Sequence, residues 1–167
     1  MSGLRAHGIQ VALPAGWDGR IAVRREGGGE KLVSATGTHV VTARSRPVMH
    51  LANFGLPSGG GDFGSGAVEL MGDGDVFVVL FEHEPAASST ALFRAEGLPR
   101  SLSPRDFDFS TLRRGIAGQS GYQAFFHDGG RAFCLYVVLG SHARRARLVP
   151  MVNAVLATVA LTPVSGG

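Results

Sequence analysis

The chain has 167 residues, of which 44% are hydrophobic and 17% charged, a composition that is typical of a globular protein and excludes a disordered chain. The formal net charge is +3, and every basic residue except Lys31 is arginine. Acidic residues are spread among the arginines and only 8% of residues are aromatic, so no nucleic-acid-binding pattern of interleaved basic and aromatic residues is present.

The N-terminal third is predicted to consist of strands separated by turns. Apolar side chains alternate over residues 8–13 and again over residues 20–25, which is the period of a half-buried β-strand. Proline and glycine in residues 14–19 predict the turn between these two strands. Two more strands are expected at residues 38–43 and 48–54.

Four segments are expected to be mobile, because they are terminal or rich in glycine. Two are flexible tails at residues 1–7 and 164–167, and two are loops at residues 26–31 and 57–66.

The central part of the sequence predicts two hairpins. In the first, residues 67–71 pair with residues 76–82 across an Asp-Gly turn, and the continuous apolar run in the second strand indicates burial on both faces. In the second, residues 121–127 pair with residues 131–139 across the Asp-Gly-Gly segment 128–130.

One helix is predicted near the C-terminal end. Apolar residues at helical spacing from Leu148 to Val159 form one face, and Ser141 is a candidate N-cap. Pro150 leaves two alternatives open. Either the helix begins after Ser141 and is kinked, or it begins near Val149 with proline in its first turn.

These elements predict one domain over residues 1–167 of the α+β class. The expected fold is an antiparallel β-sheet built of hairpins, packed against a C-terminal helix and one or two shorter helical segments. The single cysteine, Cys134, excludes an internal disulfide, and its apolar surroundings in sequence predict a buried thiol.

Two motifs at opposite ends of the chain suggest a family. A strand that ends in the sequence LPAGW (Leu13–Trp17), a sheet of long hairpins, and a final helix over residues 148–158 resemble the Mog1/PsbP-like α/β/α sandwich family. The arginine-rich, lysine-poor composition is similar to that of actinobacterial proteins. The chain lacks the N-terminal lipoprotein cysteine of some members, so a membrane anchor is not expected.

The resemblance implies an accessory or binding protein without a shared catalytic set. Together with the closing helix, the LPAGW motif predicts that Trp17 packs in the core or at its edge, close to the C-terminal helix.

The motifs of common enzyme and cofactor sites are incomplete in this sequence. The segment 59–64 matches G-x-G-x-x-G, but no helix is predicted after it, as dinucleotide binding requires. Asp73 and Asp75 suit a turn rather than a calcium loop, and Ser120 is not in a G-x-S-x-G elbow. We therefore expect no catalytic residue, no cofactor and no metal.

One alternative is a small-ligand or metal-binding hydrolytic enzyme. Glu82, His83 and Glu84 follow a buried strand, and with His50 they offer carboxylates and imidazoles for metal binding or acid–base catalysis. This alternative requires the four side chains to converge.

The function favoured by the sequence is a non-enzymatic binding or accessory module that acts through protein–protein contacts, with a homodimer as one form of partnership. No membrane-spanning segment is predicted, and the expected location is the cytoplasm. Phenylalanines in loops and paired arginines are the candidate contact residues. The candidates are Phe54, Phe63, Arg113, Arg114, Arg144 and Arg147.

Overall fold

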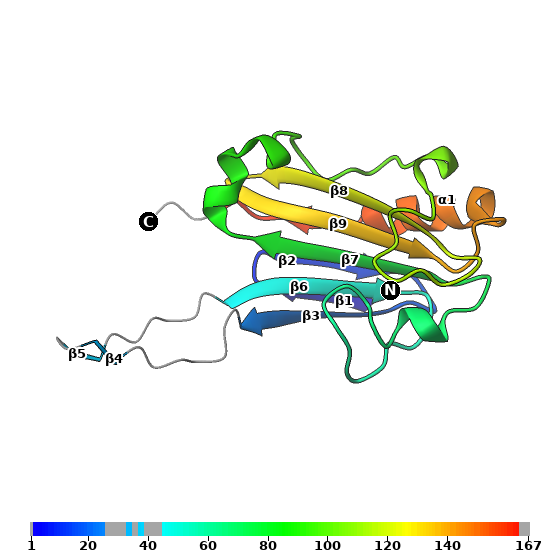
Figure 1. The fold of residues 1–167 in the computed structure, drawn as a ribbon, viewed down its shortest axis with the longest axis horizontal. Coiled ribbons are helices and arrows are strands. Elements are labelled where there is room, and N and C mark those ends of the chain that lie inside the picture. The colour runs from blue at the N-terminus through cyan, green and yellow to red at the C-terminus, as the bar shows by residue number, and fades with distance from the viewer. Residues whose placement is uncertain (1, 26–32, 35–36, 39–44, 164–167) are drawn as a thin grey trace.

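The computed structural model describes residues 2–25, 33–34, 37–38 and 45–163 (Figure 1). In this part of the chain the protein is α+β, with antiparallel sheets of three and five strands, one helix toward the C-terminus and short 3-10 turns. The expected fold class is therefore confirmed.

The large sheet has the strand order β3-β6-β7-β9-β8, and every neighbouring pair is antiparallel. Its strands are β3 (Asp18–Arg25), β6 (Ser45–Ala52), β7 (Val76–His83), β9 (Arg131–Leu139) and β8 (Ser120–Asp128). Every residue of β9 is buried, as expected for a central strand that is covered on both faces.

The predicted second hairpin is confirmed as β8 and β9, with Asp128 opposite Arg131. The two glycines between them have φ angles of 57° and 80°. A two-residue turn with positive φ at both positions matches the twist of the flanking strands, and glycine adopts it without steric cost.

The predicted first hairpin is wrong. Residues 68–70 form a 3-10 helix, η1 (Val68–Leu70), because the carbonyl of Gly64 accepts from the amides of Ala67 and Val68 and turns the chain there. Both edges of β7 are instead paired with β6 and β9. The expected strand at 38–43 overlaps β4 (Val33–Ser34) and β5 (Gly37–Thr38) only at Thr38, and its other residues lie outside the described part.

A small sheet of β1 (Ser2–Ala6), β2 (Ile9–Leu13) and β10 (Ala160–Leu161) lies behind the large one (Figure 1). The sequence predicts a flexible tail over residues 1–7, but residues 2–6 pair with β2 along its whole length. The alternation of apolar residues over residues 2–6 is too weak to predict a strand. The strand forms through its pairing with β2, which the sequence of β1 alone does not indicate.

The helix α1 (Arg145–Leu156) begins between the two positions that the sequence suggests. Ser141 does not cap it, since residues 141–144 form a turn in which the amide of Arg144 donates to the Ser141 carbonyl. Pro150 lies inside the helix. It removes the hydrogen bond that its own amide would donate to the carbonyl of residue 146.

Apolar side chains form two clusters, one on each face of the large sheet. The inner cluster lies between the large sheet, the small sheet and α1, and it includes Leu80, Leu135 and Val152. The outer cluster includes Phe77, Phe81 and Tyr136 and is covered by loops. Alternate residues of β7 and β9 belong to opposite clusters, as the period of a strand dictates.

Trp17 is partly buried against the inner cluster, to which Val152 and Leu156 of α1 also belong. Its predicted place at the edge of the core is confirmed.

Candidate functional site

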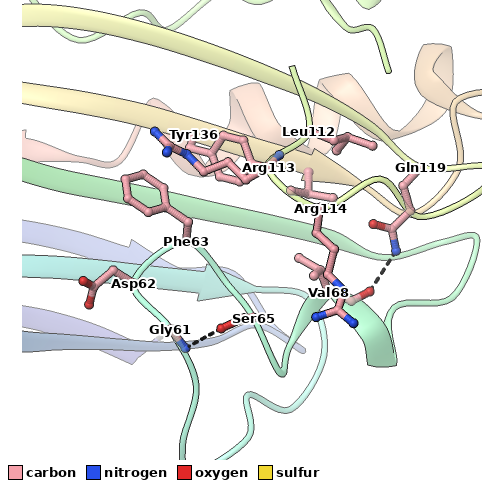
Figure 2. Close-up of a pocket in the computed structure, with 11 residues that line it drawn as sticks. Gly61, Asp62, Phe63, Ser65, Val68, Leu112, Arg113, Arg114, Gln119 and Tyr136 are labelled. Carbon is pink, nitrogen blue, oxygen red and sulfur yellow. Dashed lines mark hydrogen bonds between the residues drawn. The ribbon is translucent and has the colours of Figure 1, made fainter. Parts of the chain in front are cut away.

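The outer face of the large sheet carries a pocket of about 450 Å³, which we call the outer-face pocket (Figure 2). Its floor is β9, and its walls are a glycine loop (residues 57–66) with η1 and an arginine loop (residues 109–119). The lining residues are Gly61, Asp62, Phe63, Ser65, Val68, Leu112, Arg113, Arg114, Gln119, Tyr136 and Val138.

Phe63 forms one wall of the pocket. Its ring stacks on Phe81 with centroids 5.2 Å apart, and it meets Tyr136 edge to face at 5.8 Å. Gly64 has a φ of 89°, and a Cβ at this position would overlap the ring of Phe77. The glycine therefore allows the loop backbone to press against the sheet and hold Phe63 there.

Arg113 lies over Phe63. Its Cζ atom is 3.9 Å from the centre of the Phe63 ring, and its backbone amide donates to the Tyr136 hydroxyl at 2.9 Å. A guanidinium that stacks through its face keeps its N–H groups in the plane, where they can bind an anion. Sheet, loop and aromatic wall thus fix the position of this cation.

Arg114 is engaged differently. Its Nη1 lies 2.9 Å from Oε1 of Glu69, and both side chains are partly exposed, so the pair contributes little stability. Glu69 also accepts from the Gly66 amide at 2.6 Å. Hydrogen bonds from the backbone amides of Glu69 and Gly66, together with the Arg114 charge, lower the pKa of the Glu69 carboxyl.

Gln119 closes the end of the pocket beside η1. Its side chain donates to the Val68 carbonyl at 2.8 Å, and the residue is only 3% exposed. Its amide oxygen is buried and has no hydrogen-bond partner among the described residues. An unsatisfied buried acceptor costs about 1–3 kcal/mol.

The candidate contact residues do not all meet. Phe63, Arg113 and Arg114 line the outer-face pocket, and Phe54 packs against the same outer cluster. Arg144 and Arg147 are exposed at the start of α1, the helix that covers the inner cluster. The predicted residues therefore divide between two regions of the molecule.

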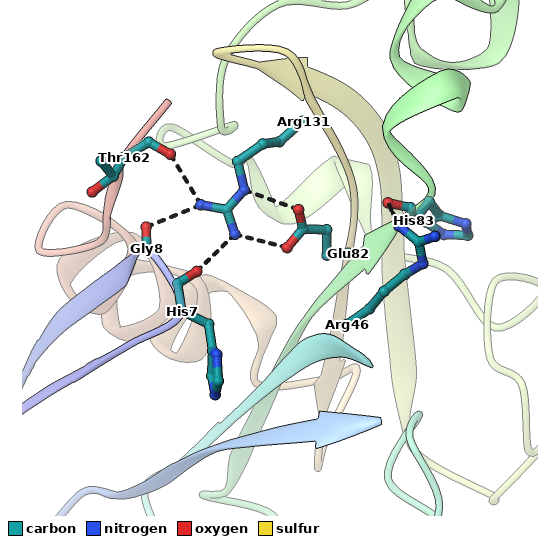
Figure 3. A network of polar contacts seen from close by, with 7 residues as sticks. All are labelled: His7, Gly8, Arg46, Glu82, His83, Arg131 and Thr162. Atoms are coloured by element: carbon teal, nitrogen blue, oxygen red, sulfur yellow. Dashed lines mark hydrogen bonds and ion pairs between the residues drawn. The ribbon is translucent and has the colours of Figure 1, made fainter. Parts of the chain in front are cut away.

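The four residues of the enzyme alternative are not brought together either. Glu82 pairs with Arg131 on the inner side of β7 (Figure 3). His50, in contrast, stacks on Phe77 on the outer face.

His83 is also on the outer face, but it lies four residues beyond the register partner of His50, or about 13 Å along the strand. Glu84 is exposed, beyond the end of β7. Among the described residues, no three histidine, cysteine or acidic side chains are arranged to hold a metal.

Sequence reasoning missed Tyr136 and Gln119. Tyr136 alternates with inward-facing residues of a central strand, so its orientation can be inferred, but nothing local shows which loops cover it. Gln119 precedes β8 without any motif around it, and its burial depends on η1, which is far away in sequence.

No protein-family model matches the chain, and neither a curated protein nor a solved structure shows significant similarity to it. Within the described residues, no helix is long and apolar enough to cross a membrane.

Proposed function

We propose that the chain is a non-enzymatic binding module that holds another protein at the outer-face pocket. The observation that carries this proposal is the convergence around one pocket of Phe63 with the neighbouring pair Arg113 and Arg114, which lies far from Phe63 in sequence. Aromatic residues and arginine are the side chains that contribute most to protein interfaces.

The chemistry of the pocket supports binding rather than catalysis. Tyr136 and the nearby Cys134 are buried, and burial raises the pKa of both groups above their ordinary values. Both therefore stay protonated near neutral pH, where neither is an activated nucleophile or base. The Tyr136 hydroxyl is already used to hold the arginine loop.

Membership of the Mog1/PsbP-like family is part of the same proposal. It is supported by the order of elements, in which a strand ending at Leu13 leads through Trp17 into antiparallel sheets and a final helix, α1. The accessory roles within that family agree with a binding module.

Photocrosslinking tests the proposal. In one variant a photoreactive residue replaces Leu70, which is 64% exposed and lies beside Glu69 near the pocket. In a matched variant the photoreactive residue replaces Arg147, which is exposed on α1. We expect the Leu70 variant alone to crosslink one protein in the source cells. The purified complex should then weaken about tenfold or more with Arg113→Gln and remain unchanged with Arg147→Gln.

A crosslinked product of twice the chain mass would identify a second copy of this protein as the partner. Equal crosslinking from both positions, or a complex that does not respond to Arg113→Gln, would contradict the proposal.

A further inference from the structure

The size of the outer-face pocket limits what can enter it. Its volume of about 450 Å³ is near the lower end of the range for small-molecule sites. A pocket of this size accepts one or two amino-acid residues, and it cannot enclose a helix or a long extended segment.

The interior of the pocket is mostly apolar. Val68 and Val138 are 5% and 1% exposed, and Leu112 packs against the same outer cluster. An occupant therefore has to present an apolar group to this part of the pocket.

The charge at the rim of the pocket calls for an anion. Arg114 is paired with Glu69, whereas among the described residues no side chain or carbonyl oxygen accepts from the Arg113 guanidinium. Asp62 also lines the pocket, but its carboxylate points away from Arg113 in Figure 2. A carboxylate could bind the free edge of Arg113 through two parallel hydrogen bonds.

Gln119 supplies an independent indication of a ligand. The residue is 3% exposed, and its side-chain oxygen lies on the pocket side of the amide in Figure 2 without a partner in the described part of the chain. A donor such as a peptide N–H, reached by a small rotation of the amide, would satisfy it.

From these features, and resting on the function proposed above, we propose that the outer-face pocket binds the C-terminal residue of the partner polypeptide. Its carboxylate binds the Arg113 guanidinium, its apolar side chain lies among Val68, Leu112 and Val138, and its amide donates to Gln119.

A terminal apolar residue fits better than an internal acidic one. It carries a carboxylate and an apolar side chain on the same Cα, as the neighbouring cation and apolar lining require. An aspartate or glutamate side chain has the carboxylate but would leave the apolar lining unfilled.

Calorimetric titration with acetylated tetrapeptides tests this inference. The probes are Gly-Ser-Gly-X peptides in which X is Leu, Ile, Val, Met or Phe, each with a free or an amidated C-terminus. We expect at least one free acid to bind about tenfold or more tightly than its amide, because a charge-assisted pair is lost in the amide.

Arg113→Gln should abolish this preference for the acid. Arg147→Gln is the matched control, because it removes an arginine from the exposed start of α1, and it should leave the preference intact. Arg113 is itself exposed, so its substitution should not disturb the core, which the amide proton spectrum of each variant checks.

Binding of no peptide, equal binding of acid and amide, or an unchanged preference in Arg113→Gln would overturn the inference. Equal affinity for 4-methylpentanoate and the leucine peptide would also overturn it, since a small carboxylic acid would then be the ligand. If the crosslinked partner binds through Arg113 but no peptide competes with it, the binding function holds and only the C-terminal assignment is wrong.

Discussion

Arg131 and Glu82 form an ion pair at the junction of the two sheets, with Nε 2.9 Å from Oε1 and Nη2 2.7 Å from Oε2 (Figure 3). The remaining N–H groups of Arg131 donate to the carbonyls of His7, Gly8 and Thr162. His7 and Gly8 join β1 to β2, and Thr162 follows β10. One guanidinium from the large sheet thus uses all its donors to hold two segments of the small sheet.

Replacing Arg131 with methionine should destabilise the protein by about 3–5 kcal/mol, because it leaves the Glu82 carboxylate, whose side chain is only 12% exposed, without a partner. Urea denaturation measures this change. Glu84→Gln is the matched control, since Glu84 is exposed two residues away, and we expect it to change the stability by less than about 0.5 kcal/mol.

The double variant Arg131→Met with Glu82→Leu should recover part of the lost stability, since no charge is then buried alone. If the double variant is as unstable as the sum of the two single changes, the two side chains do not interact as the structure shows.

Gly140 gives a second prediction, at the end of β9. A Cβ there would overlap the carbonyl oxygen of Gly72, and backbone atoms cannot move aside as a flexible side chain can. Gly140→Ala should therefore destabilise the protein by about 1–3 kcal/mol, the usual cost of overpacking. Thermal unfolding measures this change. Gly74→Ala is the control, since nothing lies within 4 Å of a Cβ at Gly74. Equal melting temperatures for the two variants would contradict this close approach.

The sequence predicted those elements whose structure depends on their own residues, namely the β8–β9 hairpin and the buried strand β7. The Asp-Gly-Gly segment at 128–130 predicts the β8–β9 hairpin because only a few residue types adopt positive φ in a two-residue turn. The apolar run over 76–81 predicts a strand buried on both faces, which β7 is.

Features that depend on distant partners were missed. The strand β1 exists through its pairing with β2, and residues 68–70 form η1 rather than a strand because β7 has other neighbours. The arginine clusters were identified in the sequence, but their surroundings also depend on distant residues. Only the structure shows that Arg113 lies over Phe63 and that Arg144 lies at the start of α1.

Cys134 provides a test of the outer cluster. The thiol is fully buried, its Sγ atom lies 3.4 Å from Nε2 of Gln123, and burial raises its pKa. Because the thiolate is the reactive form, a disulfide reagent should modify native Cys134 at least about a hundredfold more slowly than in urea. Absorbance of the released thiol follows the reaction of this sole cysteine without ambiguity. A native rate close to the unfolded rate would contradict the burial of Cys134.

His50 should make the stability depend on pH. Its Nε2 lies 2.7 Å from the Asp62 carbonyl, so Nε2 carries the hydrogen, and the buried Nδ1 has no partner among the described residues. Burial, aided by the charge of Arg20, lowers the pKa of His50 below its ordinary value of 6.5. Between the two pKa values the unfolded chain binds more protons than the folded one, so the free energy of unfolding falls as the pH falls below about 6.5.

Urea denaturation between pH 8 and pH 5 measures this dependence, and His50→Gln isolates it because all other titrating groups are shared. The wild type should lose more stability than His50→Gln over this interval, with the difference levelling off at the pKa of folded His50. The amide of glutamine can still donate to the Asp62 carbonyl, so the variant keeps a donor at this position. Parallel pH profiles for the two proteins, or an imidazole that titrates at or above 6.5 in the folded protein, would show that His50 is not desolvated beneath the glycine loop.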